Sequence, residues 1–293
     1  YDRNRLPRGM ARCGIAGCET GFVTRIGNSG TQRRPVFEPY TFMCQGGKPI
    51  ELLNGPFSDP GSFMEASIGQ TAPTCIDWDL DGALDLLVVA GDRLVWYRNR
   101  GTSSAPDWAE PVEVTAEDGS KVHKHRNKPA IVDWDGDGLP DIIGHDPRES
   151  RLLWFRRYRD EQSGELKLAS GVPLLYADGS PVEPRAWHRY TKFFNAADWK
   201  GKGSNDLFLS TCDLVLYLEN VGTNEAPRFL PPVRLAVDGI PVVIGHHVST
   251  PQPVDWDLSG ALDLLVSGES GLFHLFRRAC LDGVHRRLAC TIV

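Results

Sequence analysis

The feature that most constrains this chain is a short segment that recurs four times. The copies are CIDWDLDGALDLLV from Cys75, IVDWDGDGLPDIIG from Ile131, AADWKGKGSNDLFL from Ala196 and PVDWDLSGALDLLV from Pro253. Their first aspartates are Asp77, Asp133, Asp198 and Asp255, which are 56, 65 and 57 residues apart. Self-similarity at a nearly fixed period indicates a repeat architecture, in which one supersecondary unit packs against the next.

A second apolar run follows each copy and completes the unit. These runs read RLVWYRNRGT, RLLWFRRYRD, LVLYLENVGT and GLFHLFRRAC. Short runs rich in branched and aromatic residues, bounded by Gly, Asp and Asn, are typical of strands. No segment shows helical periodicity over ten or more residues. Three or four strands per unit at this period predict an all-β fold, a β-propeller.

A fifth copy is divided between the two ends of the chain. The segment GFVTRIGNSGTQRRPVF from Gly21 matches the second apolar run, and HRRLACTIV from His285 resembles the approach to an inner strand. We therefore expect a single domain, 1–293, with five blades, in which the C-terminal strand completes the N-terminal blade and leaves no free sheet edge. The expected blades are 285–293 with 1–53, 71–116, 127–178, 190–238 and 250–283, and the last has little room for an outer strand.

Composition narrows the classes of protein. The net charge of −6 argues against nucleic acid as a partner, and no apolar run approaches the roughly 18 residues of a membrane span. Seven cysteines, an odd number, do not make a disulfide framework. A bridge such as Cys13 to Cys290 is compatible with the sequence, and we expect a monomer.

Two copies of the repeat carry four aspartates, at positions 1, 3, 5 and 9 of a loop. They are Asp77, Asp79, Asp81 and Asp85 in one copy and Asp133, Asp135, Asp137 and Asp141 in the next. Calcium prefers about six to eight oxygen ligands, and alternate residues of a tight loop can converge on one point. Because four like charges this close need a cation, the sequence predicts structural Ca²⁺ in both loops. The plainer alternative is a hairpin turn with solvated acids.

The remaining copies depart from this pattern. Asp255, Asp257, Ser259 and Asp263 make a weaker third candidate, whereas Lys200 and Lys202 occupy ligand positions after Asp198 and abolish the site. Asp2 and Asn4 are a remnant of the same Asp-loop pattern near the N-terminus. We interpret the metal as structural: it stabilises the turns and takes no part in catalysis. We interpret the recurring Trp78, Trp134, Trp199 and Trp256 as packing between blades.

The DWDxDGxxDLLV core followed by xxxYxNxGT resembles the FG-GAP/VCBS repeat family of β-propellers, over most of the chain. This resemblance implies a secreted or periplasmic protein with calcium in the hairpin between the first two strands of a blade. The family includes integrin heads, lectins and propeller-type polysaccharide lyases, so the resemblance does not fix the function.

A histidine recurs just before the inner strand of four blades: His125, His188, His247 and His285. Inner strands line the central channel, so these imidazoles are expected to gather round one mouth, opposite the calcium hairpins. Arg126, Arg189 and Arg286 follow three of them, and His123, His246, Trp187 and Tyr190 lie close by. Three interpretations remain open: turn-capping side chains repeated with the fold, an anion-binding mouth and a transition-metal site.

An acidic polysaccharide or oligosaccharide suits a mouth of this chemistry, with Trp187 stacking on sugar. For β-elimination on a uronate, Arg189 or Arg126 would neutralise the carboxylate, His188 or His125 would be the base, and Tyr190 or His247 the acid. The resemblance to lyases that use His, Tyr and Arg supports this set. The hypotheses are therefore a uronate lyase and, from a different class, a non-catalytic sugar- or protein-binding propeller.

Overall fold

The computed structural model describes residues 15–17, 21–31, 34–53, 69, 71–123, 127–146, 151–184, 191–211, 214–244, 249–268 and 272–281. Within these ranges the chain is almost entirely β-structure. One short helix, α1 (Arg278–Leu281), is the exception. No helix of the described part is long and apolar enough to cross a membrane. The expectation of an all-β fold is confirmed.

Five sheets of three or four strands make up the body of the molecule. Sheet I contains β1 (Ile15–Gly17), β2 (Val23–Arg25) and β3 (Thr41–Phe42). Sheet II contains β6 (Ala72–Ile76), β7 (Asp85–Ala90), β8 (Arg93–Tyr97) and β9 (Val112–Glu113). Sheet III contains β10 (Ala130–Val132), β11 (Asp141–His145), β12 (Leu152–Phe155) and β15 (Val172–Pro173). Sheet IV contains β17 (Thr191–Ala197), β18 (Asp206–Thr211), β19 (Leu214–Leu218) and β21 (Val233–Arg234). Sheet V contains β24 (Ser249–Val254), β25 (Asp263–Gly268) and β26 (Phe273–Phe276).

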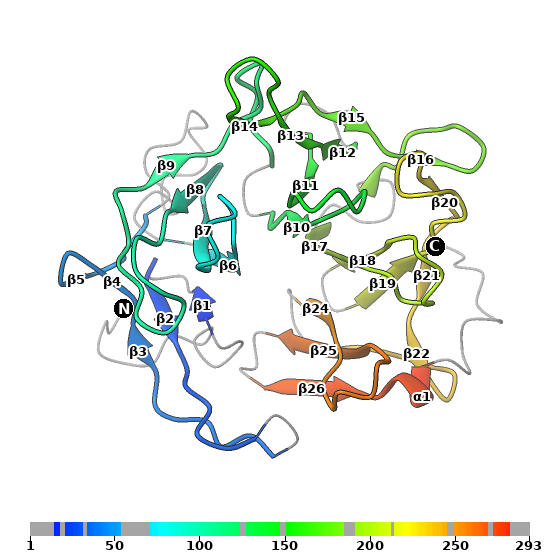
Figure 1. The fold of residues 1–293 in the computed structure, drawn as a ribbon. Coiled ribbons are helices and arrows are strands. Elements are labelled where there is room, and N and C mark those ends of the chain that lie inside the picture. The colour runs from blue at the N-terminus through cyan, green and yellow to red at the C-terminus, as the bar shows by residue number, and fades with distance from the viewer. Residues whose placement is uncertain are drawn as a thin grey trace, which may run out of the picture.

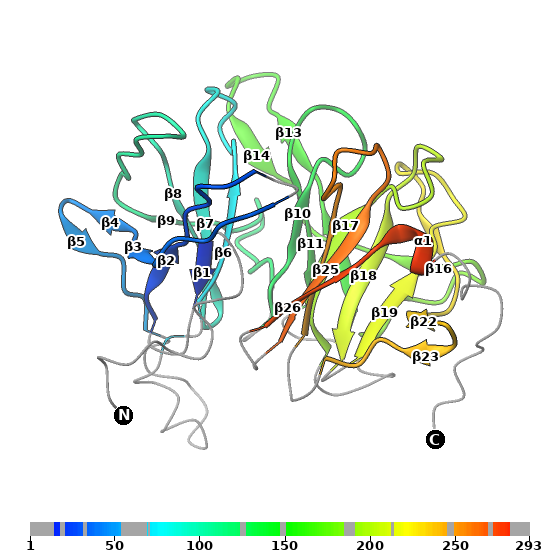
Figure 2. The same ribbon diagram turned by 90° about the horizontal axis from the view of Figure 1, so that it is seen from below.

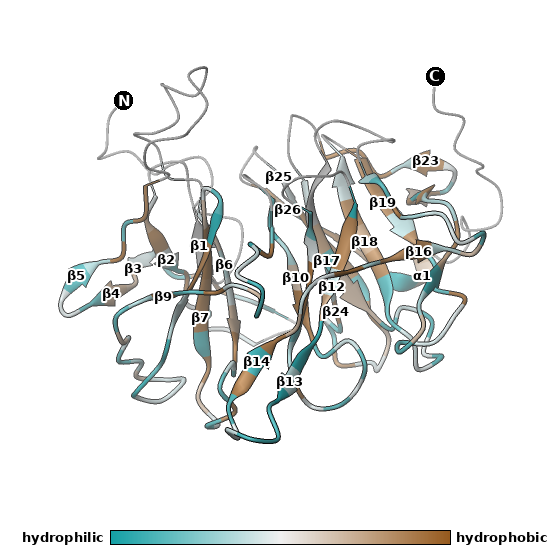
Figure 3. Cartoon of the chain, turned by 90° about the horizontal axis from the view of Figure 1, so that it is seen from above, coloured by the Kyte–Doolittle hydropathy of each residue, from teal (hydrophilic) through white to brown (hydrophobic). Residues whose placement is uncertain are grey.

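Smaller strand pairs lie between and outside these sheets. They are β4 (Cys44–Gln45) with β5 (Lys48–Pro49), β13 (Arg157–Arg159) with β14 (Leu166–Leu168), β16 (Leu175–Tyr176) with β20 (Arg228–Phe229), and β22 (Ala236–Val237) with β23 (Ile240–Pro241). The β13–β14 hairpin and the β22–β23 hairpin project on opposite faces of the molecule (Figures 2 and 3). The first hairpin lies in sheet III's repeat, after its third strand.

The five sheets stand around a common centre in a β-propeller arrangement (Figure 1). Neighbouring strands within each of these five sheets are antiparallel, so each repeat folds as a meander. The strands β6, β10, β17 and β24 lie at the inner ends of their sheets, and β10 and β24 both contact β17. Apolar residues follow the strands and polar residues the loops (Figure 3).

Each pair of consecutive sheets encloses its own apolar core. Trp78 of sheet II's repeat packs with Ile142 and Phe155 of sheet III. Trp134 packs with residues of sheet IV, and Trp199 packs with Leu264 and Val266 of sheet V. The prediction that these tryptophans pack between blades is therefore confirmed for three of the four. Val23 and Met43 of sheet I's repeat share a further core with sheet II.

Sheets I and V differ from the rest in ways that bear on ring closure. Sheet I has strands that match the second, third and fourth strands of sheet II, and no described strand lies inside β1. Sheet V ends in α1, with no outer strand among the described residues. Phe37 of sheet I's repeat lies near Phe273 of β26, with ring centroids 6.4 Å apart. Closure by residues 285–293 stays a prediction, because those residues lie outside the described part.

Candidate metal centre

The loop from Asp77 to Asp85 connects β6 to β7, and its first aspartate holds the turn together. Asp77 Oδ1 accepts the backbone N–H of Asp81 (3.1 Å), and Oδ2 accepts that of Gly82 (2.9 Å). Gly82 has a φ of 92°, a left-handed conformation that glycine adopts without a Cβ penalty. The sequence therefore builds this turn locally, through one capping carboxylate and one glycine.

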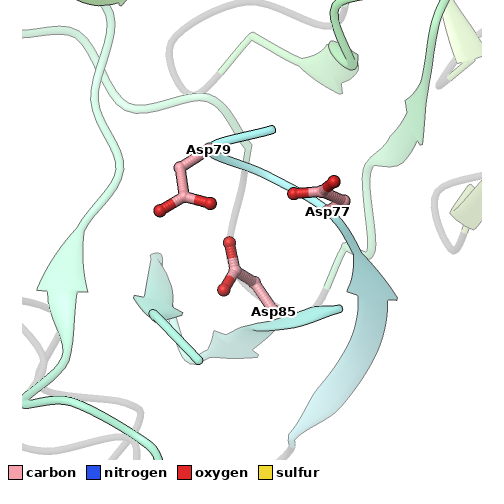
Figure 4. A group of neighbouring side chains, drawn as sticks. All are labelled: Asp77, Asp79 and Asp85. Atoms are coloured by element: carbon pink, nitrogen blue, oxygen red, sulfur yellow. The ribbon is translucent and has the colours of Figure 1, made fainter. Parts of the chain in front are cut away.

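The same turn brings three carboxylates together. One oxygen from each of Asp77, Asp79 and Asp85 lies within 4.8 Å of the others (Figure 4). Asp85 is fully buried, and its two oxygens accept the backbone N–H groups of Trp78 (3.1 Å) and Asn99 (2.7 Å). Burial raises the pKa of Asp85, since a buried carboxylate loses its hydration.

The loop from Asp133 to Asp141, between β10 and β11, also has a capping first aspartate and three grouped carboxylates, here at positions 1, 3 and 5 in place of 1, 3 and 9. Asp133 accepts the N–H groups of Gly136 (2.9 Å) and Gly138 (3.0 Å), and its oxygens group with those of Asp135 and Asp137 within 4.8 Å. Burial raises the pKa of Asp141, which is fully buried, to about 6. Both loops thus hold excess negative charge in a confined space.

The donor set of these loops fits a hard cation. Every candidate ligand is a carboxylate oxygen, the type that calcium prefers. The Asp135 side chain is only 3% exposed, and its Oδ1 is buried without a hydrogen-bond donor. A buried, unsatisfied carboxylate oxygen is costly unless something positive approaches it. A metal ion held by Asp77, Asp79 and Asp85, or by Asp133, Asp135 and Asp137, would supply that charge.

The arginines that follow the third strands of sheets II and III reach into these two loops. Arg98 lies 2.5 Å from Asp79 Oδ2 through Nε and 3.3 Å from Asp81 through Nη2. Arg156 repeats the arrangement, at 2.5 Å from Asp135 and 3.2 Å from Asp137. Both arginine side chains are about half exposed, at 52%. Sequence reasoning missed them; the signal is a charged residue directly after the aromatic that ends the strand.

The two remaining loops keep the turn and change the charges. Asp255 accepts the N–H groups of Ser259 and Gly260, each at 2.9 Å. Arg277 pairs with Asp257 (3.0 Å) and Asp263 (2.8 Å). These acids do not form a group as close as those of the first two loops among the described residues.

The loop from Asp198 to Asp206 contains ammonium groups instead. Asp198 caps the backbone N–H groups of Lys202 (2.9 Å) and Gly203 (2.8 Å). Lys202 Nζ donates to the Asn220 carbonyl and lies 3.4 Å from Asp206 Oδ1. This geometry agrees with the interpretation that the lysines have taken over the cation's place.

The predicted mouth lies almost entirely outside the described residues. This applies to His125, Arg126, Trp187, His188, Arg189, Tyr190, His246, His247, His285 and Arg286, and also to Cys13 and Cys290. His123 is described and is buried, at 1% exposure. Asp92 and Lys121 form an ion pair near it.

A groove between sheets II and III is a second feature that sequence reasoning missed. It has a volume of about 420 Å³ and lies between β8, β9 and the β13–β14 hairpin. Its lining includes Trp78, Trp96, Val112, Glu117 and Tyr158. The groove depends on a hairpin that only one repeat carries among the described residues, so the repeat pattern could not reveal it.

Two interactions give the groove a fixed wall. Arg157, which is 4% exposed, lies 3.7 Å over the Trp78 ring and donates to the Trp78 carbonyl. Burial lowers the pKa of Arg157 to about 10, so it stays cationic near neutral pH. The Tyr158 hydroxyl donates to Glu117 at 2.7 Å. Packing and hydrogen bonds therefore hold the aromatic groups of the groove in place.

Comparison with known proteins identifies the repeat. The FG-GAP-like repeat model matches residues 77–144, from the first aspartate of one loop to β11 of the next sheet. Residues 77–144 therefore match an FG-GAP-like repeat, within a chain whose sheets have a β-propeller arrangement. A search of curated proteins finds no match.

Two of the solved structures that match this chain are a lectin and a toxin pore. One is an Agrocybe aegerita lectin described as recognising non-reducing terminal N-acetylglucosamine: 17% identity, TM-score 0.44, with 92% of this chain and 63% of the lectin covered. The other is the Tc holotoxin pore of Photorhabdus luminescens: 16% identity, TM-score 0.35, with 85% of this chain and 11% of the toxin chain covered. The chain thus spans less than two-thirds of the length of either protein.

Proposed function

We propose that this chain is a carbohydrate-binding β-propeller of a secreted or periplasmic protein, with structural calcium in its loops. The observation that carries the proposal is the groove between sheets II and III. A binding site for a small ligand is concave, largely apolar and fixed by a few polar groups. The groove is concave and combines the aromatic and apolar groups of Trp96, Val112 and Tyr158 with the charged Glu117 and Lys167, so its lining is about as polar as it is apolar.

Sugar chemistry fits the groove better than a purely apolar ligand would. The C–H face of a pyranose packs on aromatic rings, and its hydroxyls need donors and acceptors that are already oriented. Glu117 is oriented by Tyr158 and also accepts the Ser170 N–H at 3.3 Å. Lys167 is held by Asp160 at 2.7 Å. Such preorganised groups lose little side-chain freedom when a ligand binds.

A glycan array followed by calorimetric titration of the best ligand tests this function. Trp96→Ala is expected to weaken binding at least tenfold, roughly the loss of one good aromatic contact. Trp154→Ala is the matched control, because Trp154 occupies the equivalent position on β12 and does not line the groove. Equal binding by both variants and the wild type would exclude the groove as the sugar site.

Calcium in the loops from Asp77 to Asp85 and from Asp133 to Asp141 is part of the same proposal. The ion would neutralise the clustered carboxylates and fix the β6–β7 and β10–β11 turns. The loop from Asp255 to Asp263 is a weaker third candidate. This role is structural, since the loops lie at hairpin turns between the first two strands of their sheets.

A uronate lyase at the mouth is the second candidate. One observation favours it: β10 and β24 both contact β17. The segments that directly precede these inner strands in the sequence contain His125, His188 and His247, and the hypothesis assigns them to one mouth of the channel. In this hypothesis Arg189 or Arg126 neutralises the carboxylate, His188 or His125 removes the α-proton, and Tyr190 or His247 protonates the leaving oxygen.

Incubation with a panel of uronate polysaccharides tests the lyase, with ultraviolet absorbance of the unsaturated product as the readout. His188→Ala and His125→Ala are expected to lower the rate at least a hundredfold, as loss of a general base does. His274→Ala, which removes an imidazole on β26, serves as control. Absence of product across the panel would leave the binding function alone.

A further inference from the structure

The charged residue that directly follows the third strand has the sign opposite to that of its loop. Arg98, Arg156 and Arg277 follow the strands of the three acidic loops. Glu219 occupies this position in the repeat whose loop carries Lys200 and Lys202. Glu219 contacts both lysines, at 2.7 Å and 3.6 Å. Because both the loop and the residue after the third strand have inverted their charge in this repeat, the contact between them stays attractive.

We propose that Arg98 and Arg156 are internal counterions that a divalent cation must displace from the two acidic loops. The inference rests on the proposed calcium sites and adds a determinant of their affinity. Calcium binding would then release two guanidinium groups toward solvent, on the face of the propeller that carries the β13–β14 hairpin.

Competition for the same carboxylates is the basis of this inference. Asp79, one of the three acids grouped in the first loop, is the residue that Arg98 Nε contacts at 2.5 Å. Asp135 stands in the same relation to Arg156, also at 2.5 Å. A metal ion that took these oxygens as ligands would bring a charge of +2 close to each guanidinium. Like charges at such separations repel strongly where solvent is partly excluded.

The exposure of the arginines makes displacement feasible. Both side chains are 52% exposed, whereas the acids they contact are 15% and 3% exposed. A guanidinium that leaves the loop therefore regains water, while the carboxylates it leaves stay enclosed for the ion. Because the arginine side of each pair is half exposed, water and salt weaken its attraction to the acid, which allows calcium to compete.

In the loop from Asp198 to Asp206, lysine ammonium groups supply the positive charge that a bound cation would supply in the acidic loops. Lys202 Nζ contacts Asp206, the buried acid at position 9 of its loop. Glu219 then replaces the arginine, because an arginine there would face two ammonium groups. In every described repeat that has such a loop, the residue after the third strand thus carries the charge opposite to that inside the loop.

The test is calcium titration by calorimetry on the full chain, with the melting temperature measured in excess chelator and in calcium. Arg98→Gln with Arg156→Gln is expected to raise calcium affinity about two- to fivefold, the equivalent of one exposed ion pair lost per site. The melting temperature in chelator is expected to fall, because the carboxylates lose their counterions. Arg98→Lys with Arg156→Lys keeps the positive charge, so its calcium affinity and its melting temperature in chelator are expected to stay closer to those of the wild type.

Arg100→Gln is the matched control, since Arg100 pairs with Asp107 outside the loop. Equal calcium affinity in the wild type and the glutamine variant would overturn the counterion inference and leave the calcium sites standing. Absence of calcium binding in every variant would overturn both proposals. If the double variant does not fold, each single substitution is titrated, and each is expected to raise the affinity of one site only.

Discussion

The loops from Asp133 to Asp141 and from Asp198 to Asp206 have the same turn and opposite charges. In both, the first aspartate accepts two backbone N–H groups, and the glycine five residues after it is a donor with positive φ: Gly138 at 87° and Gly203 at 83°. The first loop encloses carboxylates and the second encloses ammonium groups. The comparison shows that the capping aspartate shapes the turn, while positions 3 and 5 decide which cation neutralises it.

Removal of calcium is expected to have the largest effect, and only on the acidic loops. At a calcium concentration about a thousandfold above Kd, each site adds about 4 kcal/mol to the free energy of unfolding, or roughly 8–15 °C in Tm. Thermal unfolding with and without chelator measures this shift. The Asp135→Asn, Asp137→Asn variant should lose part of it, and an unchanged Tm in chelator would contradict calcium stabilisation.

Lys202→Met is expected to have the second-largest effect, and it changes the loop from Asp198 to Asp206. Asp206 is fully buried, and the variant leaves it without its ammonium partner. We expect a loss of about 2 kcal/mol, below the value for a fully buried pair because Lys202 is 30% exposed. Chemical denaturation measures it. Lys200→Met should cost less, since its partner Glu219 is partly exposed; equal losses would argue against a special role of Lys202.

Asp198→Ala is expected to cost about 1–2 kcal/mol, because two backbone N–H groups lose their acceptor. The loss should be the same with calcium and with chelator. Asp133→Ala, the equivalent change in the acidic loop, should lose the calcium-dependent stabilisation as well. Denaturation of both variants under both conditions makes the test, and a calcium-dependent effect of Asp198→Ala would show that the loops are not separate in function.

Lys200→Asp combined with Lys202→Asp and Glu219→Arg should change stability least in chelator, because all the charges invert together. The variant is expected to bind one more calcium ion per chain than the wild type. Calorimetric stoichiometry measures this. Lys200→Asp with Lys202→Asp alone retains Glu219, so it should bind that ion more tightly than the triple variant but be less stable in chelator, where the added acids repel Glu219. An unchanged stoichiometry in the triple variant would mean that side-chain charge alone does not select the cation.

Much of the fold follows from short-range signals. The Asp-Trp repeat marks the start of each turn between inner strands, and the apolar runs after it predict β7, β11, β18 and β25. The tryptophans were recognisable as packing residues because they recur with the turn. The β13–β14 hairpin was not recognisable, because RRYRD replaces the NxGT signal in that repeat and has no counterpart to compare.

The sequence by itself determined the repeat, the antiparallel meander and the capped Asp loops, because these depend on residues within one repeat. Only the tertiary structure decided which charges face those loops and where a groove forms. Arg98 lies 19 residues beyond Asp79 along the chain, and Arg157 covers a tryptophan of the neighbouring sheet. Contacts between strands and between sheets depend on how the repeats pack, and no local pattern encodes that packing.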